Sequence, residues 1–312
     1  MKLLVTGADG FVGRHLVRRL ARDGHQVTAA CRPGGQPVAW DPGVTEIPLE
    51  LTDDASVRAA ADTGPEGVVH LAAVASNREA NADPGQAWVV NAAGTARLAE
   101  ALGRRRRQAG EGDTRLLLVS SGEVYGRGGV APRRESDPIA PASPYAASKA
   151  GAELAGLEVW RRTGLPVIIA RPFTHTGPGQ EVRFVLPAFV ARMREARATG
   201  ARTVSSGNLD PVRDMLDVRD VVAAYVLLLQ MGQPGETYNV SRGEGSSMRE
   251  LFDRLATLIG VRVEPELDPA LARAADIPHL VGDSTKLRRA TGWAPSRSLE
   301  QTLRGLVDAE AD

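Results

Sequence analysis

Three polar side chains near the middle of the sequence have the types and spacing needed to move a proton to or from a substrate oxygen. Tyr145 and Lys149 are four residues apart, so on a helix they would lie on one face. A free phenol has a pKa of about 10, and a fixed ammonium beside it favours the phenolate and lowers that pKa. Ser121 can hydrogen-bond the same oxygen and stabilise negative charge as it develops. We therefore predict that Ser121, Tyr145 and Lys149 form a catalytic set, with Glu123 as a further catalytic carboxylate.

A glycine pattern at the start of the chain is typical of a dinucleotide site. An apolar run, residues 2–6, leads into Gly7, Gly10 and Gly13 and then into a helical pattern. Gly7 permits the tight turn, Gly10 lets the backbone approach a pyrophosphate, and Gly13 allows close packing of the helix on the strand. The helix would aim its first N–H groups at the phosphates, so Phe11 and Val12 are predicted contacts too. Taken alone, the pattern also fits a glycine-rich turn without a ligand, but the Tyr–Lys pair further along favours the dinucleotide.

The ends of the next strands indicate which dinucleotide is bound. Arg32 ends the second strand, where a carboxylate would bind the adenosine ribose of NAD and a guanidinium suits the 2′-phosphate of NADP. The alternative is that Arg32 stacks over the adenine or faces solvent. We predict NADP, with NAD as the alternative cofactor. Further contacts to the adenine and the riboses are expected where the third and fourth strands end, at Glu50, Leu51, Leu71, Ala72 and Ala73.

The elements that must position these residues follow a regular alternation. Apolar strand-like runs alternate with longer amphipathic stretches, which is typical of a parallel sheet covered by helices. Such units close right-handed, so ligands gather at the carboxyl ends of the strands. Strands are predicted at residues 2–6, 26–31, 45–49, 67–71, 115–120 and 166–171, and helices at residues 11–23, 55–62, 84–107 and 144–163.

Beyond residue 172 the alternation weakens, and segments rich in glycine, proline and arginine separate further helices. We predict an α/β fold in which residues 1–172 form a Rossmann-type doubly wound parallel sheet that binds the dinucleotide. Residues 173–312 would form a smaller, mixed α/β substrate lobe, from which segments near residues 218–241 return to the first domain. The later helices are predicted at residues 186–198, 218–230, 248–258 and 299–308.

Composition excludes several classes of protein. Lysine plus arginine and aspartate plus glutamate both number 38, so the net charge is zero and a global basic field for nucleic acid is absent. The single cysteine, Cys31, cannot form an intrachain disulfide, and the five histidines do not occur at ligand spacings, so no metal is expected. The longest apolar run, residues 221–229, is too short to span a bilayer, and the start of the chain has no signal-peptide pattern. We expect a cytoplasmic protein with no membrane partner.

These motifs resemble those of the extended short-chain dehydrogenase/reductases, in the branch that contains nucleotide-sugar epimerases, dehydratases and reductases. The resemblance implies that Ser121, Tyr145 and Lys149 are catalytic and that Lys149 also holds the nicotinamide ribose. It places Pro172 and Phe173 near the nicotinamide. Glu50 is a departure, because the family usually has aspartate at the adenine. The residues that carry the likeness are 6–13, 70–73, 91–95 (with Asn91 as a cofactor contact), 120–126, 145–149 and 171–173.

The second half has further motifs, at residues 171–180, 184–189, 207–214, 281–287 and 291–295. These motifs look most like those of the subgroup that reduces GDP-4-keto-6-deoxy-mannose. By that likeness Arg213 clamps the diphosphate of a nucleotide-sugar substrate. The alternative is that Arg213 forms a structural ion pair with Asp214 or Asp217. Thr174 stands where the subgroup commonly has asparagine, which changes the contacts to the sugar. The predicted substrate contacts are Ser121, Glu123, Thr174, Phe184, Asn208 and Arg213.

Three functions fit these observations. The first is NADPH-dependent reduction of the C4 keto group of a nucleotide-diphosphate 4-keto-6-deoxy-hexose. The expected reaction converts GDP-4-keto-6-deoxy-D-mannose to GDP-6-deoxy-D-mannose (GDP-D-rhamnose). The second is a redox-neutral 4,6-dehydratase or epimerase, in which Glu123 would remove the C5 proton; the chain lacks the longer, arginine-rich loop of the GDP-mannose dehydratases. The third is a redox sensor without turnover. Such proteins typically lose the Tyr–Lys pair, so the presence of Tyr145 and Lys149 argues against this function. The resemblance also implies a homodimer formed through the helices at residues 84–107 and 144–163.

Overall fold

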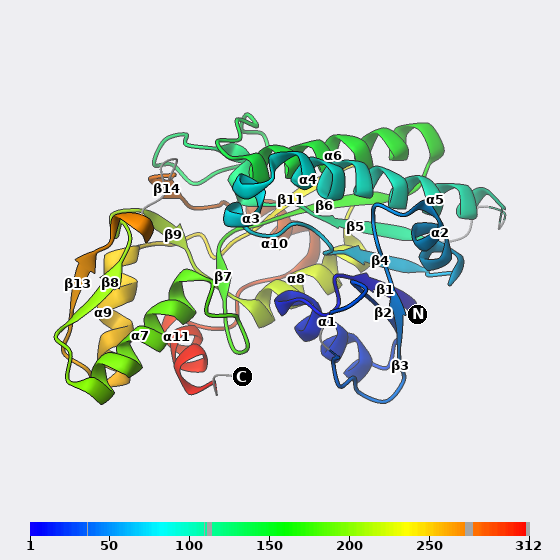
Figure 1. Ribbon diagram of the computed structural model, residues 1–312. Helices are drawn as coiled ribbons and strands as arrows, with labels where there is room; N and C mark the ends of the chain where they lie inside the picture. Colours follow the sequence, from blue (N-terminus) through cyan, green and yellow to red (C-terminus); the bar gives the residue numbers. More distant parts are fainter. Residues whose placement is uncertain (36, 109, 111–113, 272–276, 310–312) are drawn as a thin grey trace.

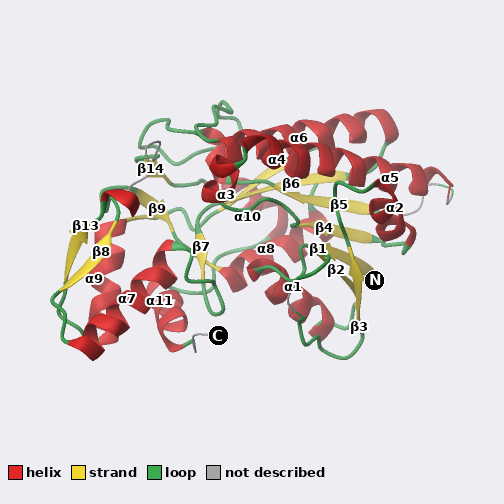
Figure 2. Cartoon of the chain, viewed as in Figure 1, coloured by secondary structure: helices red, strands yellow, loops and turns green. Residues whose placement is uncertain are grey.

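The core of the protein is a twisted sheet of seven parallel strands (Figures 1 and 2). A computed structural model describes the chain except residues 36, 109, 111–113, 272–276 and 310–312. The strand order is β11-β6-β5-β4-β1-β2-β3, so the prediction of a doubly wound parallel sheet is confirmed. The ends of the six predicted strands differ from the observed ones by at most one residue, and β11 was not predicted as a strand. The strands are β1 (Lys2–Thr6), β2 (Gln26–Cys31), β3 (Val44–Pro48), β4 (Gly67–His70), β5 (Arg115–Val119), β6 (Val167–Pro172) and β11 (Thr237–Val240).

Helices cover both faces of this sheet because the central strands are apolar on both sides. One face packs on α1 (Phe11–Arg22) and α8 (Val218–Met231). The other face packs on α2 (Asp54–Asp62), α5 (Gly94–Gln108) and α6 (Pro144–Thr163) (Figure 1). Since α8 and β11 belong to this core, the chain leaves the sheet after β6 and returns to it before its end.

The helix predicted over residues 84–107 is interrupted, so that part of the prediction is wrong. The chain forms α4 (Pro84–Trp88), a π-helical turn (Val89–Ala93) and then α5. A π turn carries one extra residue, and here it turns the amide of Asn91 inward. That amide accepts a hydrogen bond from Val74 N at 2.8 Å and donates one to Ser148 Oγ at 2.9 Å. The preceding helix, α3 (Asn77–Ala82), was not predicted.

The second lobe lies at the left of Figure 1 and has its own apolar core. Its helices are α7 (Val185–Thr199), α9 (Met248–Ile259) and α11 (Leu299–Asp308), while α10 (Thr285–Thr291) packs back on α8 and β11. The lobe's short strands pair as β8 (Thr203–Ser206) with β13 (Glu264–Leu267), β7 (His175–Thr176) with β10 (Leu216–Asp217), and β9 (Val212–Asp214) with β12 (Gly245–Ser247) and β14 (His279–Leu280). Two 3₁₀ turns, Gly122–Tyr125 and Pro269–Leu271, complete the described elements.

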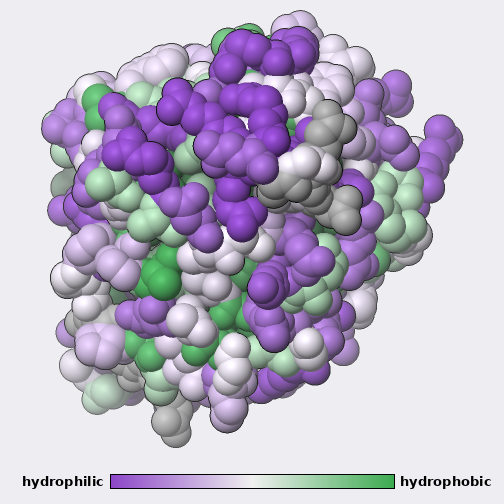
Figure 3. All heavy atoms as spheres, turned by 90° about the vertical axis from the view of Figure 1, so that its right-hand side faces the viewer, coloured by the Kyte–Doolittle hydropathy of each residue, from purple (hydrophilic) through white to green (hydrophobic). Residues whose placement is uncertain are grey.

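Part of the arginine run at the end of α5 is ion-paired. The carboxyl ends of α5 and α6 lie on the face turned toward the viewer in Figure 3, whose upper part is largely hydrophilic. There Glu100 binds both Arg104 and Arg162 at 2.8 Å. Within the described ranges, the helices are all too short or too polar to cross a membrane.

Candidate active site

The glycine turn lies where β1 and β4 end side by side and the chain connections diverge to opposite sides, which is the ligand crevice of such sheets. Gly7 has φ +65°, and a Cβ on it would lie 2.8 Å from Ala72 N. A Cβ on Gly13 would lie only 2.2 Å from Gly7 O. Gly10 is the N-cap of α1, and among the described residues no side chain caps its first amides. The turn is therefore a tight backbone cradle that leads into uncapped helix amides, the arrangement that suits a pyrophosphate.

A buried hydrogen-bond network joins this turn to the end of β4. Thr6 Oγ1 accepts hydrogen bonds from Leu71 N at 3.2 Å and Ala72 N at 3.1 Å, and lies 2.8 Å from His70 Nδ1. His70 Nε2 lies 3.1 Å from Thr95 Oγ1. Burial, with the charge of Lys149 acting in the same direction, lowers the pKa of His70 to about 3, so this histidine is a neutral structural link. The network holds the segment ending at Ala73, predicted to face the riboses, beside the glycine turn.

The residues predicted at the adenosine end also gather at this edge of the sheet. Arg32 follows β2 and is exposed, and Glu50 follows β3. Hydrogen bonds from Thr52 N and Oγ1, at 3.0 and 2.8 Å, lower the pKa of Glu50, and Arg32 adds to the effect. Glu50 is therefore ionised, and its carboxylate already accepts two hydrogen bonds from Thr52. Leu51 is buried against Gly94.

The predicted catalytic residues come together above the end of β5. Ser121 caps the 3₁₀ turn by accepting a hydrogen bond from Glu123 N at 3.1 Å. Ser121 also acts on Tyr145, whose pKa it lowers. Tyr145 lies in the first turn of α6, whose N-cap is Ser143, and Lys149 follows one turn later with 5% of its surface exposed.

The ionisation of Tyr145 differs from the sequence-based expectation. Burial raises the pKa of Tyr145, the charge of Glu123 raises it further, and the hydrogen bond to Ser121 opposes them. Burial also lowers the pKa of Lys149 to about 8, against the charge of Glu153. Burial and Glu123 thus oppose ionisation of Tyr145, whereas the sequence-based expectation was a lowered pKa. A neutral phenol is a proton donor.

Glu123 is oriented by a residue that the sequence did not reveal. Its Oε2 accepts a hydrogen bond from Asn77 Nδ2 at 2.8 Å. Asn77 opens α3, the unpredicted helix, and its Oδ1 is buried with no hydrogen-bond partner among the described residues. The carboxylate is therefore fixed at the same site as Ser121 and Tyr145.

Aromatic side chains form the floor of the site after β6. Phe173 stacks on Tyr125, with ring centroids 6.3 Å apart. Its ring lies against Gly122 and Gly282, where added Cβ atoms would approach it to 3.1 and 2.5 Å. Pro172 is buried at the end of β6. Asn91, by contrast, is buried within the π turn, and its side chain is bonded to Val74 and to Ser148 of α6.

Phe11 connects the cofactor helix to the loop that follows Phe173. It stacks on His175, with centroids 6.4 Å apart, and meets His15 edge-on at 5.5 Å. His15 Nε2 lies 2.9 Å from Pro178 O, and His175 Nδ1 lies 2.9 Å from Phe173 O. Burial lowers the pKa of both histidines. Val12, next to Phe11, is partly buried in the first turn of α1.

The predicted substrate residues are spread over the second lobe. Arg213 in β9 donates hydrogen bonds to the carbonyls of Val212 and Ile277, at 2.9 and 2.6 Å. Asp217 is ion-paired to Arg219 at 2.6 Å, and Asp214 accepts hydrogen bonds from backbone amides. Asp214 and Asp217, the two carboxylates considered as partners of Arg213, thus bind other groups of the protein.

The other three residues predicted to bind substrate in this lobe lie in different segments of the chain. Thr174 O accepts a hydrogen bond from Leu216 N at 2.9 Å. Phe184 is the N-cap of α7, with Arg183 5.1 Å from its ring centroid. Asn208 is exposed, and its Oδ1 accepts a hydrogen bond from Asp210 N.

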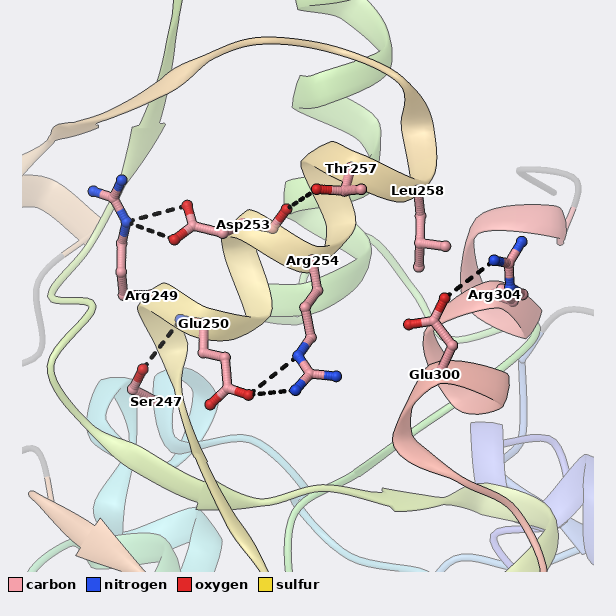
Figure 4. Close-up of a pocket in the computed structure, with 9 residues that line it drawn as sticks. All are labelled: Ser247, Arg249, Glu250, Asp253, Arg254, Thr257, Leu258, Glu300 and Arg304. Atoms are coloured by element: carbon pink, nitrogen blue, oxygen red, sulfur yellow. Dashed lines mark hydrogen bonds and ion pairs between the residues drawn. The ribbon is translucent and has the colours of Figure 1, made fainter.

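A polar groove on the second lobe is separate from this site. Figure 4 shows it between α9 and α11, where ion pairs such as Arg249–Asp253 and Arg254–Glu250 line it. None of the predicted site residues lines this groove. Across the part of the chain that the structure describes, histidine, cysteine and acidic side chains form no cluster suited to a metal ion.

Comparisons with known proteins agree with this geometry. Residues 3–241 match the model of the NAD dependent epimerase/dehydratase family. GDP-6-deoxy-D-mannose reductase from Pseudomonas aeruginosa is 36% identical, over 98% of this chain and 96% of the relative. The solved structure of RMD from Pseudomonas aeruginosa complexed with NADPH has a TM-score of 0.82 at 33% identity, and covers 98% of this chain and 97% of its own. The Thermus thermophilus UDP-glucose 4-epimerase complex with NAD has a TM-score of 0.86 at 32% identity, and covers 99% and 98%.

The family match spans the glycine turn, the catalytic turn and the Tyr–Lys helix, and the relatives extend over both lobes. The chain therefore belongs to the NAD dependent epimerase/dehydratase family of extended short-chain dehydrogenase/reductases and is an NAD(P)-dependent enzyme.

Proposed function

We propose that the protein reduces the C4 keto group of a nucleotide-diphosphate 4-keto-6-deoxy-hexose, with GDP-4-keto-6-deoxy-D-mannose as substrate and GDP-6-deoxy-D-mannose as product. The observation that carries the proposal is the placement of Ser121 and the fixed Glu123 carboxylate with Tyr145 and Lys149 of α6 at the carboxyl edge of the sheet. Burial and the charge of Glu123 raise the pKa of Tyr145 there, which keeps the phenol protonated. Reduction of a carbonyl requires a proton donor at the oxygen. The similarity to GDP-6-deoxy-D-mannose reductase over both lobes supports this substrate.

The residues of the chain divide the work of reduction among them. The reduced nicotinamide, when bound, supplies the hydride. Tyr145 donates its hydroxyl proton to the C4 oxygen, and Ser121 hydrogen-bonds that oxygen as charge develops on it. Lys149, as an ammonium, stabilises the phenolate that Tyr145 leaves and holds the nicotinamide ribose. Phe173 and Pro172 exclude water from the face of the ring.

The two lobes hold the two ligands. In this proposal residues 1–172, with the segments near 218–241, bind the dinucleotide, and the remaining residues bind the nucleotide sugar. Arg213 clamps the diphosphate, and Thr174, Phe184 and Asn208 contact the sugar nucleotide. At the adenosine end, Arg32 binds the 2′-phosphate of NADP, a cofactor choice supported by the NADPH complex of RMD.

The test follows the absorbance of the reduced nicotinamide. We expect purified protein with NADPH and GDP-4-keto-6-deoxy-D-mannose to oxidise one NADPH per sugar reduced. The same assay with GDP-mannose, without added reductant, is the control. Conversion of GDP-mannose without consumption of NADPH would contradict the reductase and identify a dehydratase. No turnover of any sugar nucleotide would favour a redox sensor.

The dehydratase or epimerase is the second candidate because of one specific contact. The hydrogen bond from Asn77 fixes the Glu123 carboxylate beside Tyr145, where a base could remove the C5 proton. Several relatives carry such names, including a UDP-glucose 4-epimerase from Mycolicibacterium smegmatis that is 34% identical. A fixed carboxylate also raises the pKa of Tyr145, which serves the reductase equally well.

A homodimer through α5 and α6 is the proposed assembly. Leu154 on α6 is 67% exposed and Trp88 on α4 is 45% exposed. A Cβ on Gly151 would lie 2.5 Å from the Trp88 ring, so Trp88 packs against the same helix. Exposed apolar side chains on paired helices are typical of a subunit interface.

Leu154→Glu is therefore expected to convert a dimer into a monomer, since it places a charge in the contact. The measurement is molar mass by light scattering after gel filtration. Leu267→Glu is the matched control, because Leu267 is 65% exposed on β13 in the other lobe and should leave the dimer intact. A wild-type monomer would contradict the proposed assembly.

A further inference from the structure

A chain of buried polar side chains runs from the catalytic helix across the sheet. Glu153 in α6 accepts hydrogen bonds from Arg171 Nε at 2.8 Å and from its Nη2 at 2.6 Å. Arg171 Nη1 donates to the Tyr125 hydroxyl at 2.8 Å, and that hydroxyl donates to Asn239 Oδ1 at 2.7 Å. None of these four residues is more than 4% exposed. An ion pair buried this deeply persists only when its polar groups are satisfied, so the network is rigid.

Asn239 extends the network to the segments that cover the site. Its backbone N donates to Glu135 Oε1 at 2.8 Å, and its side-chain amide donates to Arg133 O at 2.8 Å. Arg133 and Gly282 form an isolated β-bridge, and Gly282 lies against the ring of Phe173. The network thus connects the catalytic helix with the long loop after the 3₁₀ turn and with the Phe173 floor.

The other end of the network lies on the same helix as Lys149. Glu153 lies one helical turn after Lys149, on the same face of α6. The other titratable groups around Lys149 are Tyr145 on the same helix, with Glu123 facing Tyr145 from the 3₁₀ turn, and His70 from β4, which is neutral. The negative charge of Glu153 raises the pKa of Lys149, whereas burial lowers it to about 8.

We propose that Glu153 is a positioning residue for Lys149. Arg171 fixes the Glu153 carboxylate and is itself bonded to Tyr125. One helical turn from Lys149, this fixed charge favours the ammonium form of the lysine beside Tyr145. The same hydrogen bonds fix the Ser121–Tyr125 turn against α6, because Tyr125 is the last residue of that turn. The kinetic consequence of this inference rests on the proposed reductase function, but the titration of Lys149 does not.

The chain has three lysines, Lys2, Lys149 and Lys286, so the ammonium of interest can be observed directly. Full-length protein labelled with ε-¹³C-lysine is titrated by NMR, and the resonance missing from Lys149→Met is assigned to Lys149. We expect Glu153→Gln to lower the midpoint of Lys149 by about one pH unit, since it removes the facing anion and leaves the Arg171 cation. Lys2 and Lys286 are the internal references.

Glu158→Gln is the matched control. Glu158 lies on the same helix, is exposed and pairs with Arg162 at 2.6 Å, so its loss should leave Lys149 unchanged. A second variant, Glu153→Gln with Arg171→Met, removes both buried charges and guards against misfolding of the single variant. Its midpoint should also fall, but by less, because the arginine no longer repels the lysine.

The outcomes separate this inference from the proposed function. A Lys149 midpoint equal to the wild-type value in both Glu153 variants, or shifted equally by Glu158→Gln, would overturn the positioning role. In Glu153→Gln the basic limb of the kcat profile should move to lower pH together with the NMR midpoint. A shifted midpoint in a protein whose wild type turns over no sugar nucleotide would support the positioning role and refute the reductase.

Discussion

Tyr145→Phe is expected to lower kcat for NADPH-dependent reduction by about a thousandfold, while the Kd for NADPH stays within about threefold of the wild-type value. The substitution keeps the ring and removes only the hydroxyl. Burial raises the pKa of that hydroxyl, so it carries a proton at neutral pH. Steady-state rates at saturating NADPH, with cofactor binding followed by nicotinamide fluorescence, separate the two effects.

The control for this variant is a second buried phenol. Tyr238 in β11 is 1% exposed, and its hydroxyl accepts a hydrogen bond from Gln233 N at 3.0 Å. Tyr238→Phe should therefore cost a comparable hydrogen bond and leave kcat within about twofold. If Tyr145→Phe retained more than a tenth of the wild-type kcat, Tyr145 would not be the proton donor.

The parts of the site that were predictable are those encoded by local spacing. The glycine turn and the Tyr145–Lys149 pair each occupy one strand–helix junction or one helical turn, so sequence distance reports spatial distance. The parallel order of the strands followed from their alternation with helices, and it placed both motifs at one edge of the sheet.

The contacts that could not be predicted join residues far apart in the sequence. Asn77 reaches Glu123 from a helix of six residues, too short to give a periodic pattern. Tyr125 and Asn239 meet only because β11 returns to the sheet beside β6. The π turn likewise depends on Asn91 reaching Val74, a contact without a local signal.

The direction of the pKa shift of Tyr145 could not be predicted from the sequence for a different reason. Spacing indicated that an ammonium would lie near the phenol, but the depth of burial is a property of the folded chain. Desolvation disfavours every charged form, so it raises the pKa of the phenol and lowers that of the lysine. Which effect dominates can be decided only once the surrounding side chains are placed.

Gly13→Ala is expected to have the second large effect, on both stability and cofactor binding. A Cβ at this position would lie 2.2 Å from Gly7 O and 2.6 Å from Ala8 O. These are backbone atoms of the turn itself, so α1 must move away from β1 at a cost of about 3 kcal/mol in the free energy of unfolding. The same movement displaces the first amides of α1, which we propose to face the pyrophosphate, so the Kd for NADPH should rise at least about tenfold.

Chemical denaturation and NADPH titration measure the two effects of Gly13→Ala separately, and Gly129→Ala is the matched control. A Cβ on Gly129 would meet no heavy atom within 4 Å, and the φ of Gly129 is not positive, so alanine there should change neither quantity. Gly13 would affect cofactor binding only by displacing the backbone of Gly7 and Ala8. A loss of NADPH affinity must therefore be accompanied by a loss of stability. A Gly13→Ala protein as stable as the wild type that still bound NADPH normally would show that the helix can settle elsewhere, and the cradle would then not depend on this contact.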